Sequence, residues 1–121
     1  MMRSLIAGLL LAGIATAALA ADPAAGEKIF KSQCGICHST VAGKNAIGPS
    51  LFGVVGTKAG EVPGFHFSEA NKKSGLTWDN ATLDRYLQNP RGVVPGTLMT
   101  YAGLKDEAKR ADLIAYLNTL H

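Results

Sequence analysis

A five-residue stretch near the start of the chain constrains the fold more than any other feature. Residues 34–38 read C-G-I-C-H, and the chain has no cysteines besides these two. Two thiols at this spacing can both reach one edge of a porphyrin, and the histidine that follows can be held beneath the ring, so the pattern is typical of covalent haem attachment. We therefore expect Cys34 and Cys37 to form thioethers to one haem c, and His38 to bind its iron.

Other uses of the same residues are less consistent with the rest of the chain. A thioredoxin-like dithiol needs a βαβ setting, which the sequence pattern lacks. A structural zinc site needs a fourth ligand, for which only His66 or His121 could be nominated. A disulfide across so short a loop stabilises a fold little. Haem attachment is the interpretation that we favour.

The residues before this motif have the pattern of an export signal. A positive start is followed by an unbroken run of small and apolar residues over 5–18, and then by Ala18-Leu19-Ala20, which is typical of the site that a signal peptidase cuts after. The alternative is an uncleaved membrane anchor, but alanines and glycines dilute the run. We expect a cleaved signal peptide over residues 1–20, one haem domain over residues 21–121, and a periplasmic location.

The charge balance and the size of the remaining domain also limit its function. Loss of Arg3 with the leader leaves eleven Lys and Arg residues against nine Asp and Glu. This balance does not predict a nucleic-acid partner, which requires a concentrated basic surface. About a hundred residues is small for a self-sufficient core. A cofactor that fills the interior would make up for this.

Apolar spacing and capping residues predict short helices around a long irregular middle. The expected helices begin at Pro23 after an Asp22 cap, and lie over 68–74, over 81–88 and over 107–120. Leu83, Tyr86 and Leu87 share a stripe in the third; in the last, Leu113, Ile114, Leu117 and Leu120 recur on one face, with Arg110 and Asp112 on the solvent side.

The segment between residues 41 and 64 shows no helical pattern and contains six glycines. A loop of this length counts against a compact domain unless it has a function. Glycines permit positive φ angles and close approach, so the loop could wrap a flat apolar ligand.

Met99 is the expected second ligand of the iron. Met1 and Met2 leave with the leader, which makes Met99 the sole methionine of the mature chain. It lies in a turn-rich segment rather than on an apolar helical stripe, and methionine is a common second haem ligand. His66 is the main competitor.

Together these motifs resemble class I cytochrome c, in particular the mitochondrial cytochrome c and bacterial cytochrome c2 group. The matching segments are residues 26–30, 34–38, 48–51, 63–65, 70–72, 76–78, 86–90, 95–99, 102–104 and 112–117. The resemblance implies a small all-α cytochrome c fold, with three to five helices and long loops wrapped around one covalent haem. It also implies a soluble electron carrier of a respiratory chain, not an enzyme, that works by Fe(III)/Fe(II) cycling.

The resemblance further implies roles for individual residues. His38 and Met99 would be the axial ligands, and the Pro49 carbonyl would accept the other ring N–H of His38. Tyr86 and Thr97 would lie on the Met99 side, and Asn71 and Trp78 near the buried haem edge. Gly26 and Phe30 would meet Leu113 and Tyr116 where the first and last helices cross.

Departures from the family pattern predict two differences. Thr57 and Phe67 stand where relatives commonly carry an arginine and a tyrosine near a haem propionate, so we expect altered hydrogen bonding there, with Lys58 and His66 nearby in sequence. Gln33 and Leu98 stand where relatives often carry lysine. Because charge complementarity mainly speeds encounter, we expect a milder salt dependence of electron transfer than in strongly basic relatives.

The partners implied are redox proteins: a cytochrome bc1-type donor, a terminal oxidase, a reaction centre or a dehydrogenase. We expect a monomer that docks transiently at the membrane surface and passes electrons through the haem edge near Cys37 and Tyr101. Two alternatives stay open at this point. One is a haem peroxidase or ligand sensor with an open sixth position, and the other is a dedicated subunit of a periplasmic dehydrogenase.

Overall fold

The computed structural model describes residues 8, 13 and 20–121. The expected signal peptide over residues 1–20 therefore falls almost entirely outside the described residues. The helices are α1 (Pro23–Gln33), α2 (Glu69–Lys73), α3 (Asn80–Gln88), α4 (Pro90–Val93) and α5 (Glu107–Leu117). In the described part of the chain β structure is limited to one isolated antiparallel bridge between Lys58 and Thr77. The expected all-α fold is confirmed.

Each helix begins after a side chain that accepts a hydrogen bond from a first-turn amide. The carboxylate of Asp22 accepts from the N–H of Ala24 at 2.9 Å, and that of Asp79 accepts from the N–H of Thr82 at 2.8 Å. Ser68, Asn89 and Asp106 do the same for α2, α4 and α5. The first amides of a helix have no partner inside it, so these caps fix where the helices start.

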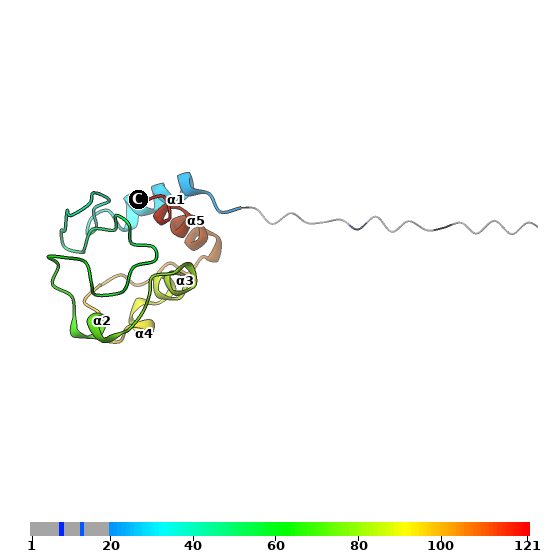
Figure 1. Cartoon of the computed structure of the whole chain (residues 1–121). Coiled ribbons are helices and arrows are strands. Elements are labelled where there is room, and N and C mark those ends of the chain that lie inside the picture. The colour runs from blue at the N-terminus through cyan, green and yellow to red at the C-terminus, as the bar shows by residue number, and fades with distance from the viewer. Residues whose placement is uncertain (1–7, 9–12, 14–19) are drawn as a thin grey trace, which may run out of the picture.

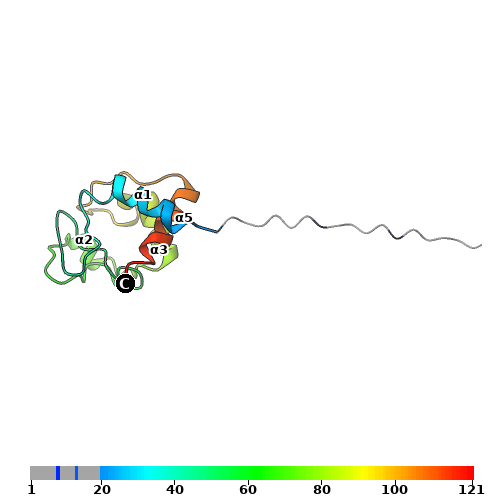
Figure 2. The same cartoon turned by 90° about the horizontal axis from the view of Figure 1, so that it is seen from above.

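Helices α1 and α5 cross at close range and lie side by side in both backbone views (Figures 1 and 2). Gly26 permits this approach, because a Cβ at that position would lie 1.9 Å from the carbonyl oxygen of Asp112. Phe30 packs beside Tyr116 with 5.5 Å between the ring centroids. Leu113 is completely buried in the same region. The crossing implied by the resemblance is confirmed.

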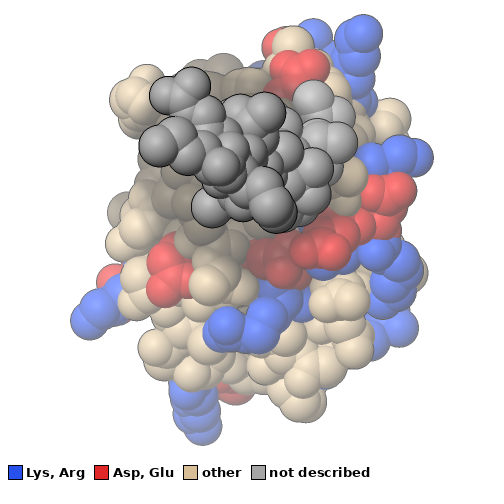
Figure 3. Space-filling model, turned by 90° about the vertical axis from the view of Figure 1, so that its right-hand side faces the viewer, with Lys and Arg blue, Asp and Glu red and all other residues tan. Residues whose placement is uncertain are grey.

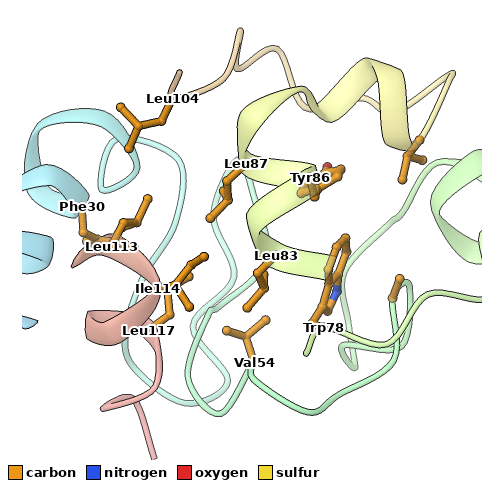
Figure 4. Close-up of a cluster of buried hydrophobic side chains, with 12 residues drawn as sticks. Phe30, Val54, Trp78, Leu83, Tyr86, Leu87, Leu104, Leu113, Ile114 and Leu117 are labelled. Atoms are coloured by element: carbon orange, nitrogen blue, oxygen red, sulfur yellow. The ribbon is translucent and has the colours of Figure 1, made fainter. Parts of the chain in front are cut away.

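The core continues from this crossing to α3. Side chains of α3 and α5 point toward a common interior, as Figure 4 shows for Leu83 and Leu87 on one side and Ile114 and Leu117 on the other. The predicted stripe of α3 is buried as a whole, since Tyr86 is also only 7% exposed.

The loop over residues 41–67 contains no helix and turns sharply at its glycines. Gly53 and Gly56, for example, have φ angles of +68° and +89°, a region that side chains with a Cβ rarely adopt. The backbone amide of Gly56 donates to the carbonyl of Trp78 at 2.9 Å, which fastens the loop beside the start of α3.

The end of α5 and the presence of α4 differ from expectation. Helix α5 ends at Leu117 rather than at Leu120, because the backbone amides of Thr119 and Leu120 donate three residues back, to the carbonyls of Tyr116 and Leu117, instead of continuing the helical pattern. Leu120, which follows the helix, still packs against the core. For this reason the apolar spacing in the sequence extends beyond the last helical residue. Helix α4 was not predicted; its four residues are too few to show a period.

The prediction that Arg110 lies on the solvent side of the last helix is wrong. Arg110 is 4% exposed, and its Nε donates to the carboxylate of Asp84 on α3 at 2.8 Å. Its Nη1 donates to the carbonyls of Leu104 and Lys105, each at 3.1 Å. A guanidinium can be buried when its donors are satisfied in this way, and a helical period alone does not reveal such partners.

Within residues 20–121, every helix falls short of the length and apolar character that a membrane crossing requires. Figure 3 shows one face of the molecule, where Lys and Arg side chains stand apart from one another with Asp and Glu side chains between them.

Candidate functional site

One cavity of about 490 Å³ gathers all the side chains that the sequence nominated. The residues in question are Cys34, Cys37, His38, Pro49, Asn71, Trp78, Tyr86, Thr97 and Met99, and each of them lines this cavity. They come from the end of α1 and the turn after it, the long loop, α2, the segment before α3, α3 itself and the segment after α4. A mostly apolar cavity with a few convergent polar groups is typical of a small-molecule or cofactor site.

The end of α1 positions the two cysteines and the histidine. The helix stops at Gln33, and the next residues turn back on themselves: the amides of Cys37 and His38 both donate to the carbonyl of Cys34, at 3.1 and 2.9 Å. This turn brings three side chains to one wall of the cavity. Both thiols are free and half-buried.

The environment of Cys34 favours an uncharged sulfur. Burial, together with the neighbouring Cys37, raises the pKa of the Cys34 thiol to about 11. The apolar wall therefore opposes a thiolate. A thioether carries no charge, so it suits this wall.

His38 is held with one ring nitrogen free. Its Nδ1 lies 2.8 Å from the carbonyl oxygen of Pro49. Because a carbonyl only accepts, Nδ1 carries the proton and the lone pair of Nε2 is left for a metal. Burial lowers the pKa of His38, against a smaller opposing effect of the Pro49 hydrogen bond, which favours the neutral ring that ligates iron. Gly48 lies directly against the ring, where a Cβ would be 2.4 Å from Cε1.

Elsewhere in the cavity lining, Tyr86, Thr97 and Met99 form a set of contacts around the sulfur of Met99. The amide of Met99 donates to Oγ1 of Thr97 at 3.3 Å, and that hydroxyl lies 3.2 Å from the hydroxyl of Tyr86. The Tyr86 hydroxyl donates to Sδ of Met99 at 3.9 Å. Burial raises the pKa of Tyr86, so its hydroxyl keeps its proton. These contacts leave the sulfur a second lone pair.

Asn71 and Trp78 supply polar groups to a part of the cavity wall formed by α2 and the start of α3. The side-chain oxygen Oδ1 of Asn71 is buried and has no hydrogen-bond partner in the described part of the chain. A buried amide without a partner is costly, so an orphaned one indicates a polar group of a ligand. Trp78 packs against Tyr86 with ring centroids 4.8 Å apart, and its indole N–H is a further donor.

The two departures from the family pattern also lie on this wall. The hydroxyl of Thr57 donates to the carbonyl of Val54 at 2.7 Å, and Phe67 packs edge-on against Phe65. Among the described residues no arginine lines the cavity, whereas Lys58 and His66 do. Altered carboxylate binding at this wall stays a prediction.

The residues present therefore fit a haem. Two thiols and a neutral imidazole lie along one wall, a thioether comes from another segment, and an orphaned amide faces the interior. The sequence marked Leu83, Leu113 and Leu117 as apolar helix faces, but it did not point to Val54 and Val62, which also line the cavity. Val54 and Val62 lie in the glycine-rich loop, where no periodicity marks a buried position.

Comparison with known proteins supports the same cofactor. Residues 23–121 match the family model described as cytochrome c. Cytochrome c2 of Rhodomicrobium vannielii is 54% identical over 115 residues, which cover 94% of this chain and 91% of the relative. Cytochrome c2 of Blastochloris viridis is 48% identical over 118 residues, or 96% and 92%. Among solved structures, cytochrome cH from Methylobacterium extorquens gives a TM-score of 0.76 at 54% identity, over 81% of this chain and 98% of that one.

Proposed function

This chain belongs to the cytochrome c family, and from that premise we propose how its residues hold the cofactor and which partners they serve. As a member of the family it is a single-haem electron carrier with covalently attached haem c. It is an electron-transfer protein rather than an enzyme, and it exchanges electrons with other redox proteins.

The attachment is assigned to Cys34 and Cys37, and the axial ligation to His38 and Met99. One observation carries this assignment: all four side chains line the same cavity, although Met99 lies far from the others in the sequence. Haem c supplies one-electron chemistry at its iron when bound. The protein's part is to fix the ligands, exclude water and set the potential.

Each supporting residue acts on one ligand or on one edge of the cofactor. Pro49 fixes the tautomer of His38 so that Nε2 would be free to bind the iron, and Tyr86 and Thr97 contact the sulfur and backbone of Met99 and so orient it. The Nδ2 group of Asn71 and the indole N–H of Trp78 would donate to the haem carboxylates. Because these side chains are oriented before electron transfer, they need to move little when the charge of the iron changes.

Electrons leave where the cavity meets the surface, close to Cys37 and Tyr101, which are both half-exposed. The partners we propose are a cytochrome bc1-type donor and, as acceptor, a terminal oxidase, a reaction centre or a dehydrogenase. The carrier works as a monomer in the periplasm after removal of residues 1–20.

Spectra of the purified protein test the ligand assignment. A pyridine haemochrome assay should report thioether-linked haem, and the ferric protein should be six-coordinate and low-spin with a Met–Fe charge-transfer band. Met99→Ala should lose that band, while the matched variant His66→Ala should keep it. An iron whose sixth bond is unchanged in Met99→Ala would overturn the assignment, and colourless protein from a host that attaches haem would overturn the cofactor.

The N-terminus of the exported protein tests the leader. Mass spectrometry of the periplasmic fraction should find a chain that begins at Ala21. An intact chain recovered from the membrane fraction would contradict cleavage and indicate an anchor.

A further inference from the structure

The four residues after Met99 are held by few hydrogen bonds. Within residues 20–121, the backbone of residues 100–103 takes part in no backbone–backbone hydrogen bond, whereas the amide of Leu104 donates to the carbonyl of Leu87 at 2.8 Å. One side-chain hydrogen bond remains in this segment: the hydroxyl of Tyr101 donates to Oε1 of Gln33. This segment, residues 100–103, is called the Met99 strap below.

Gln33 lines the same cavity as the strap but comes from a distant segment of the chain. It is the last residue of α1 and immediately precedes Cys34, while Tyr101 follows Met99 by two positions. Both Gln33 and Tyr101 line the cavity. Their hydrogen bond therefore joins the cysteine side of the rim to the Met99 side, and we call it the rim hydrogen bond.

Other contacts hold the segment around Met99 on its interior side and at its C-terminal end. Thr97 and Tyr86 hold the interior side, where Thr97 donates its amide to the carbonyl of Val94 at 3.0 Å. At the far end, Leu104 is 8% exposed and its carbonyl accepts from Arg110. Between these points, outward movement of the strap is opposed by packing and by the rim hydrogen bond.

We propose that Gln33 and Tyr101 are positioning residues that keep the Met99 strap closed, and so determine how readily an outside ligand replaces Met99. The proposal rests on the proposed function, because it takes Met99 to be a ligand of the iron. Neither residue touches the iron in this scheme. The rim hydrogen bond acts on the equilibrium between closed and open strap, and only the open form admits a competing ligand.

Imidazole is a suitable probe, because its nitrogen can bind the iron only when the sulfur of Met99 leaves. Spectral titration of the ferric holoprotein gives its apparent affinity. Loss of one partly exposed hydrogen bond should favour the open form by about three- to tenfold. Tyr101→Phe and Gln33→Leu should each bind imidazole tighter by that factor. Gln33→Glu keeps an acceptor for the tyrosine hydroxyl and should stay within about twofold of the unchanged protein.

The double variant separates the rim hydrogen bond from general loosening. If the two side chains act through one bond, Tyr101→Phe with Gln33→Leu should bind imidazole no tighter than the stronger single variant. Two effects that multiply would mean that the residues act independently, and would overturn the proposal. Wild-type affinity in both single variants would overturn it as well. Gln33 is exposed at a helix end, so Gln33→Leu is expected to fold even if Tyr101→Phe does not.

The same samples distinguish this proposal from the function on which it rests. An unchanged ferric protein without a Met–Fe charge-transfer band would overturn the ligand assignment and the role of the strap together. A normal band with unaltered imidazole affinity in the variants would overturn the role of the rim hydrogen bond alone.

Discussion

The crossing of α1 and α5 and the cavity wall around Met99 differ in what fills the space between their segments. At the crossing, protein atoms meet protein atoms: Gly26 leaves no room for even a Cβ, and Leu113 is completely buried. Around the cavity, the segments face about 490 Å³ that we assign to haem c, and Asn71 has a buried oxygen without a partner. One region is complete as polypeptide, and the other is complete only with the cofactor.

This difference shows how a small domain can stay folded although it contains long loops. The crossing fixes helices α1 and α5 to each other through close packing, which tolerates little change in volume. The segments of the cavity wall are instead held in place by the cofactor that we assign to the cavity. Changes at the crossing should therefore act on the stability of the whole protein, and changes at the wall should act first on the cofactor's ligands.

The largest expected effect is at the crossing. Gly26→Ala would place a Cβ 1.9 Å from the backbone oxygen of Asp112, which cannot move without shifting α5. We expect the free energy of unfolding to fall by about 3 kcal/mol, measured by denaturant unfolding of the holoprotein. Gly35→Ala is the matched control, since its Cβ would meet nothing closer than 3.5 Å. Equal losses in the two variants would contradict the close packing.

The second largest effect is expected at the buried guanidinium of Arg110, which joins α5 to α3. Asp84→Asn removes the countercharge of Arg110 but keeps a similar shape, so we expect a loss of about 2 kcal/mol in the free energy of unfolding. Glu27→Gln is the control: it breaks the exposed pair with Lys31 and should change the stability little. If Asp84→Asn also changes the stability little, the carbonyls of Leu104 and Lys105 satisfy the donors of Arg110 by themselves.

Gly48→Ala should act on a ligand rather than on the whole fold. Its Cβ would be 2.4 Å from the ring of His38, and a side chain can move where a backbone cannot. The ring would give up its hydrogen bond to Pro49, which costs about 1 kcal/mol of stability. We expect a clear shift of the reduction potential in protein-film voltammetry. If the reduction potential stays constant while the melting temperature falls, Gly48 acts on the stability of the whole protein, as Gly26 does at the crossing.

The smallest effect concerns the surface beside the cavity. Leu98 and Ile47 line the cavity and are 68% and 75% exposed, so apolar side chains stand where a partner would dock. We expect the bimolecular rate of electron transfer to fall by less than about tenfold between ~10 and ~200 mM salt. Leu98→Lys should steepen this dependence, whereas Val41→Lys, away from the cavity, should not. A steep dependence in the unchanged protein would contradict the prediction.

The two helices of the crossing were predictable because their signals are local, whereas the crossing itself was implied only by the family resemblance. Asp22, Pro23 and Asp106 are cap residues next to apolar periods, and such patterns mark helix starts whatever surrounds them. Where a tertiary contact overrode the local pattern, the prediction failed. Arg110 lies on a face that its neighbours in sequence mark as polar, but Asp84 on another helix and two carbonyls enclose it.

At the cavity wall, the sequence determined one side more fully than the other. The spacing of residues 34–38 sets two thiols and an imidazole on one turn, since five consecutive residues have few ways to lie apart. The other side depends on segments that meet only after folding. The approach of Tyr86 to Met99 and the hydrogen bond between Tyr101 and Gln33 join residues distant in the sequence, and no local pattern encodes which of them will touch. Tertiary structure decided these contacts because the chain must close around a shared interior before such partners come within reach.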